Sequence, residues 1–128
     1  MAGLLAQSLI LRIHATWAWV VIIGNGLAGV WALSAWQIPS LRSRALWWFT
    51  IVVELAIGVQ VCLGVTMVSL QHRKVVPFHM FYGFVAIIAA TIIYSYRPQL
   101  KRWMYQLYGF GGLFLMGLGI RAVLKVKG

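Results

Sequence analysis

The chain has 128 residues and a net charge of +10, yet only 9% of its residues are charged and 62% are hydrophobic. A soluble domain carries about 25% charged residues, so this composition indicates a protein that folds in lipid. The basic residues stand between apolar blocks and at their ends, where anionic lipid headgroups attract them. This placement excludes nucleic acid as the expected partner and favours anionic membrane lipids or an acidic subunit.

Four apolar blocks follow one another, at about residues 13–36, 45–70, 76–96 and 103–124. Each is long enough to cross a bilayer, which takes roughly 20 apolar residues. Lipid offers no partners to backbone polar groups, so each span must be helical. We predict an all-α polytopic membrane protein in which residues 1–128 form one integral-membrane domain. Short links make it an antiparallel four-transmembrane-helix bundle with consecutive helices as neighbours.

The first block has Arg12 just before it, His14 at its start and Asn25 near its middle. It is too long for the core of a signal peptide, and no convincing cleavage site follows it. Residues 1–12 are also mostly apolar, and we expect them to lie at the membrane interface or to lengthen the first helix.

The second block contains Glu54, the only acidic residue of the chain, near mid-membrane and at a depth comparable to Asn25. Ionisable groups inside a membrane are expensive and usually functional. Glu54 could relay protons, pair with an arginine of a partner, or share a hydrogen bond with Asn25; no basic residue of this chain's own spans is available to it. Cys62, the single cysteine, is interpreted as a small buried apolar residue.

The third block opens with His79, after a loop that holds His72, Arg73 and Lys74. His79 and His14 begin parallel helices, so their imidazoles should lie at a similar depth. Two such histidines could bind one haem iron axially. In that case Arg12, Arg73, Lys74 and Arg121 stand at the right level to neutralise the propionates, and Gln60 of the second block reaches the same depth. The alternative is that both histidines only form hydrogen bonds at the headgroup boundary.

The fourth block is rich in glycine, and small residues also recur in the first. Small residues let helices approach closely in lipid, so we predict tight helix contacts here. A cofactor ring or another subunit's helix is the alternative occupant. The glycines concerned are Gly24, Gly26, Gly29, Gly109, Gly111, Gly112, Gly117 and Gly119.

Four spans place both termini on one side of the membrane, called side A here, and the first and third turns on the other, side B. Six basic residues fall on side A (Arg12, Arg73, Lys74, Arg121, Lys125, Lys127) and five on side B (Arg42, Arg44, Arg97, Lys101, Arg102). The rule that cytoplasmic loops are the more positive therefore gives no orientation.

Three short motifs resemble those of small bacterial four-helix membrane proteins. The first span opens with Ile13-His14-Ala15-Thr16-Trp17, the second contains Gln60-Val61-Cys62-Leu63-Gly64, and the third opens with Pro77-Phe78-His79 shortly before Gly83. Similar motifs occur in small b-type membrane cytochromes and in haem-modifying membrane proteins. The resemblance implies a bacterial plasma-membrane location and a possible haem b. The second and fourth spans contain no histidine, which excludes a two-haem protein.

No set of nucleophile and base, metal-ligand cluster or phosphate-binding loop is present, so an enzyme acting alone is not expected. The leading hypothesis is a non-catalytic membrane subunit of a larger respiratory or photosynthetic complex, packed against partner helices and lipids. The second is a b-type electron carrier that uses His14 and His79. A proton-coupled transporter that uses Glu54 ranks third.

Overall fold

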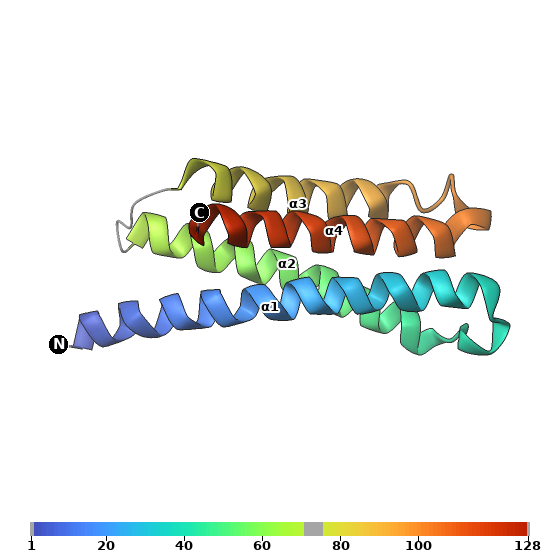
Figure 1. Ribbon diagram of the computed structural model, residues 1–128, viewed down its shortest axis with the longest axis horizontal. Coiled ribbons are helices and arrows are strands. Elements are labelled where there is room, and N and C mark those ends of the chain that lie inside the picture. Colours follow the sequence, from blue (N-terminus) through green and yellow to red (C-terminus); the bar gives the residue numbers. More distant parts are fainter. Residues whose placement is uncertain (1, 71–75, 128) are drawn as a thin grey trace.

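The computed structural model describes residues 2–70 and 76–127. Within these ranges it has no strand and four long helices, joined in part by two 3-10 turns. The elements are α1 (Ala2–Gln37), η1 (Pro39–Leu41), α2 (Arg44–Leu70), α3 (Pro77–Ser95), η2 (Lys101–Trp103) and α4 (Met104–Lys127). The helices form one elongated bundle with both termini at the same end (Figure 1). Each is long and apolar enough to cross a membrane, which confirms the predicted all-α bundle.

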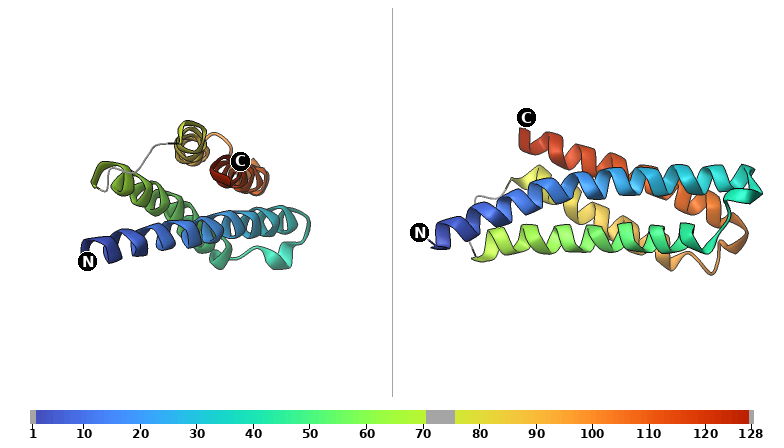
Figure 2. Two further views of the ribbon diagram at one scale, coloured as in Figure 1. Left: turned by 60° about the vertical axis from the view of Figure 1, so that its left-hand side comes forward. Right: turned by 90° about the horizontal axis from the view of Figure 1, so that it is seen from below.

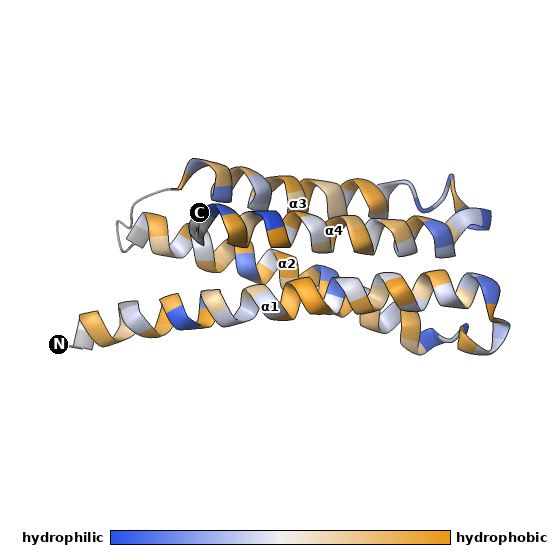
Figure 3. Cartoon of the chain, in the orientation of Figure 1, coloured by the Kyte–Doolittle hydropathy of each residue, from blue (hydrophilic) through white to orange (hydrophobic). Residues whose placement is uncertain are grey.

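Apolar residues cover most of each helix, and hydrophilic ones gather mainly toward the ends (Figure 3). Residues 2–12 continue helix α1, which is one of the two arrangements expected for them. Its 36 residues span about 54 Å at 1.5 Å per residue. Pro39 and Pro77 begin η1 and α3, as suits a residue that lacks a backbone N–H.

The closest helix contact joins α1 and α4, and it is made by the backbone atoms of glycine residues. A Cβ atom built on Gly29 would lie 2.7 Å from the carbonyl oxygen of Gly109, and one built on Gly112 would lie 2.8 Å from the carbonyl oxygen of Asn25. No larger residue fits either position without moving the helices apart. The glycines therefore serve the close packing predicted for them.

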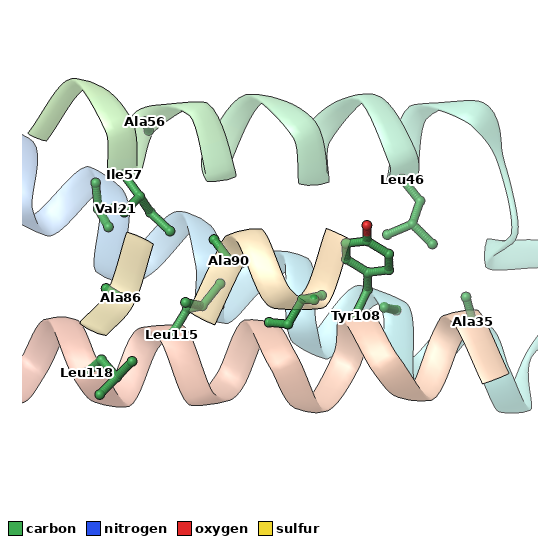
Figure 4. Close-up of a cluster of buried hydrophobic side chains, with 12 residues drawn as sticks. Val21, Ala35, Leu46, Ala56, Ile57, Ala86, Ala90, Tyr108, Leu115 and Leu118 are labelled. Carbon is green, nitrogen blue, oxygen red and sulfur yellow. The ribbon is translucent and has the colours of Figure 1, made fainter. Parts of the chain in front are cut away.

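The core lies where α2 and α3 add their side chains to this pair. Ala32, Ala35 and Leu46 are completely buried, and Leu115 is nearly so. Figure 4 shows these and neighbouring side chains gathered between the ribbons of all four helices. Small alanines on α1 face larger side chains on α2 and α4, which brings the helix axes close together.

Consecutive helices are not all close neighbours, contrary to expectation. Helix α2 packs on α1 and α3 packs on α4, but α2 and α3 make little contact with each other. The left view of Figure 2 shows α3 beside α4, with α2 crossing α1. The glycine contact explains this difference, since it places α1 and α4 at the centre and leaves a loosely packed α2–α3 seam.

Candidate functional site

His14 of α1 and His79 of α3 lie side by side near side A. Their ring centroids are 5.9 Å apart and their planes are inclined by 80°. Both side chains are partly buried. Helices α1 and α3 do not otherwise pack extensively on each other, so the two imidazoles are the groups that bring them together.

The orientation of His79 is set by α4. Its Nδ1 atom lies 2.8 Å from the backbone carbonyl oxygen of Ala122. A carbonyl oxygen can only accept a hydrogen bond, so Nδ1 carries the proton and donates it. The Nε2 atom of His79 is then left with a free lone pair, which is the form in which a histidine binds a metal.

The environment of His14 is built by α2. The Nε2 atom of Gln60 donates to the backbone carbonyl oxygen of His14 over 2.8 Å. A Cβ atom built on Gly64 would lie 3.3 Å from Cε1 of His14, so the absence of a side chain at Gly64 makes room for the imidazole. All four helices thus contribute to the histidine site.

Two polar atoms of this site lack a protein partner. Nδ1 of His14 and Oε1 of Gln60 are both buried, and neither forms a hydrogen bond with any residue that the structure describes. Leaving a buried polar atom unpaired costs about 1–3 kcal/mol, so such atoms call for an explanation. One of these atoms belongs to His14, and the other belongs to the side chain that donates to the His14 carbonyl oxygen.

The basic residues predicted around the histidines are placed only in part. Arg12 precedes His14 by two residues on α1 and is exposed. Arg121 of α4 lies 6.0 Å from the ring centroid of Tyr82 on α3. Arg73 and Lys74, like His72, lie outside the described residues. Of the four basic residues, the structure therefore describes Arg12 and Arg121, both exposed.

Asn25 and Glu54 do not pair through the Asn25 amide nitrogen. This nitrogen donates to the backbone carbonyl oxygens of Val21, at 2.8 Å, and of Val53, at 3.4 Å. Because Val53 belongs to α2, the fully buried Asn25 links α1 to α2. These two hydrogen bonds give Asn25 a structural role between the two helices.

Glu54 faces a cation that the sequence analysis did not assign to it. Its carboxyl group lines a cavity of about 260 Å³ together with Arg97, Tyr94 and Tyr108. The guanidinium of Arg97 is close enough to Glu54 to act on its charge. It also stacks on the Tyr94 ring, with Cζ 4.4 Å from the centroid. Arg97 had been counted as a side-B surface residue because it follows the third span.

A multidentate metal centre is not found in the described part of the chain, where no group of three or more His, Cys, Asp or Glu side chains converges. Cys62 is exposed on α2 rather than buried. The histidine pair is thus the one predicted ligand set that the described ranges bring together.

No family model, no curated protein and no solved structure matches this chain. Its class therefore rests on the fold, which is that of an integral-membrane four-helix protein. The resemblance to small b-type membrane cytochromes stays a prediction.

Proposed function

We propose that the chain binds one b-type haem between His14 and His79 and carries electrons in the membrane. The observation that supports this most directly is the convergence of the two histidines, which come from helices of the same direction and lie with their rings 5.9 Å apart.

The separation of the rings suits two ligands of one iron. Metal–imidazole bonds are about 2 Å long, and with a ring radius of about 1 Å at each end the centroids stand about 6 Å apart. In addition, Gly83, four residues after His79 on α3, has no heavy atom within 4 Å of the position of a Cβ, so α3 is not crowded one turn beyond the histidine.

Each residue of the site has a role toward such a group. A bound haem would supply one-electron redox chemistry. His79, oriented by Ala122, would present Nε2, and His14 would present the opposite ligand. Arg12 and Arg121 would neutralise the propionates at side A. Because the ring would enter between partly separated helices, the loose α2–α3 seam supports this arrangement.

An absorbance spectrum of the purified protein tests this function. We expect a Soret band with one haem per chain, and its loss in His14→Ala and in His79→Ala. His72→Ala is the matched control, because it removes a histidine that the proposal does not use. A wild-type protein with no Soret band, after expression with ample haem, would refute the proposal, as would a band unchanged in both ligand variants.

A second candidate, favoured by the length of α1, is an accessory subunit of a larger respiratory or photosynthetic complex. The first turns of α1 project beyond the rest of the bundle (Figure 1), and Leu4 and Leu5 there are 67% and 68% exposed. Such a projecting apolar segment fits a partner's helix. This role agrees with haem binding, and the resemblance to bacterial proteins supports a bacterial plasma membrane as its location. Comigration with a larger assembly in mild detergent is expected, and migration alone would exclude the subunit role.

A further inference from the structure

The outer face of the α3–α4 pair carries a large groove that the proposed function does not use. Its volume is about 570 Å³, and its lining is almost wholly apolar. Ile92 on α3 and Leu107, Phe110 and Phe114 on α4 supply much of this lining. The groove runs along both helices, from Leu100 and Trp103 at side B to Ala89 and Phe114 near mid-membrane.

The length of the groove matches one leaflet of a bilayer. Eleven residues separate Trp103 from Phe114, which is about 16 Å along a helix. The hydrocarbon core is about 30 Å thick, so one leaflet spans about 15 Å. A helix from a second protein would cross the whole membrane, whereas this groove ends halfway. An acyl chain of one leaflet ends at the same depth.

The charge at the side-B end identifies the kind of lipid. Lys101 and Arg102 form the turn η2 directly beside Trp103, and both are exposed. Tryptophan prefers the headgroup level of a membrane, so the two cations stand where a lipid phosphate lies. Each basic residue near a membrane surface attracts anionic lipid by about 1 kcal/mol.

From these features we infer that the α3–α4 groove is a binding site for an anionic phospholipid of the side-B leaflet. One acyl chain lies in the groove against Phe110 and Phe114. The phosphate lies against Lys101 and Arg102. The lipid fills the space between two helices that pack closely only at their inner faces.

Native mass spectrometry of the purified protein with phosphatidylglycerol and phosphatidylcholine of identical chains tests this inference. We expect phosphatidylglycerol to be retained at least fivefold more strongly. The double variant Lys101→Gln/Arg102→Gln should abolish this preference, whereas Arg44→Gln, at the same membrane level on α2, should keep it. Ala89→Phe, which narrows the inner end of the groove, should weaken the binding of both lipids.

Three outcomes would overturn the inference. The first is equal retention of the two lipids by the wild type, and the second is a preference that survives the double variant. The third concerns a different occupant: in Cys62→Ala/Ile92→Cys, efficient oxidation to a disulfide-linked dimer in liposomes would show that a second copy of the chain covers the groove. Haem content is not measured in any arm, so the result is independent of the proposed function.

Discussion

Gly64 controls the space available to His14, and this gives a test at the scale of a single atom. In Gly64→Ala the new methyl group would stand 3.3 Å from Cε1 of His14, closer than ordinary contact, so the imidazole must move. We expect haem content to fall and the free energy of unfolding to drop by about 1–3 kcal/mol, as for other overpacked sites. Absorbance and unfolding in a denaturing detergent measure the two effects.

Gly58 on the same helix is the matched control for this substitution. No heavy atom lies within 4 Å of a Cβ built there. Gly58→Ala should therefore leave haem content unchanged and stabilise the helix by up to about 1 kcal/mol, because alanine loses less backbone entropy than glycine. Equal losses in the two variants would show that His14 does not depend on Gly64.

Glu54 and Arg97 provide a second test, because each is a charged group in a partly closed cavity. Arg97→Gln removes the guanidinium from this cavity, and Glu54→Gln removes the carboxyl group. If the two charges are coupled across the α2–α3 seam, the double variant is less destabilised than the sum of the single variants. Coupling between contacting residues is typically about 0.5–3 kcal/mol. A double-mutant cycle of unfolding free energies gives this value, and strict additivity would show no coupling.

Counting along the spans was sufficient to place His14, His79 and Gln60 at a similar depth, because depth in a membrane follows from residue number at 1.5 Å per residue. It could not show that Ala122 orients His79 or that Gly64 admits His14, since both depend on helix rotation. Arg97 was missed for another reason. Its long side chain carries the charge back from the end of α3 to the level of Glu54, and residue number alone records only where the Cα atom lies.

At the scale of helices, the contact between α1 and α4 sets the arrangement of the bundle. Gly112→Ala would place a methyl group 2.8 Å from the Asn25 carbonyl oxygen and 2.9 Å from Cα of Gly29, so the two helices must separate. We expect a loss of about 1–3 kcal/mol in unfolding free energy. Detergent unfolding followed by circular dichroism measures this loss.

Gly117→Ala, on the same helix, serves as its control because nothing lies within 4 Å of that position. It should be neutral or slightly stabilising. A destabilisation as large as that of Gly112→Ala would mean that α4 tolerates no added side chain anywhere, and would remove the argument for a specific backbone contact.

The number, type and approximate bounds of the helices were predictable, because apolar blocks long enough to span lipid leave few alternatives. Which helices pack against each other was harder to predict. Short links favour consecutive pairs, and this holds for α1 with α2 and for α3 with α4. The sequence showed the glycines of α1 and α4 but not that Gly29, Gly109 and Gly112 face one another, which depends on the rotation of both helices.

At the scale of the whole molecule, the stability of the bundle should not depend on the projecting part of α1. Leu4, Leu5 and Leu9 are all exposed, so deletion of residues 2–10 should change the unfolding free energy by no more than about 0.5 kcal/mol. If the segment binds a partner, comigration with a larger assembly on a native gel should be lost. A large loss of stability would instead show that the segment belongs to the folding unit.

The pairing of α1 with α4 also has a consequence for biosynthesis. The closest helix contact joins α1 to α4, which are separated in the sequence by α2 and α3, so it cannot form until α4 has left the ribosome and entered the lipid. A chain that stops before residue 104 would lack the partner on which α1 packs most closely.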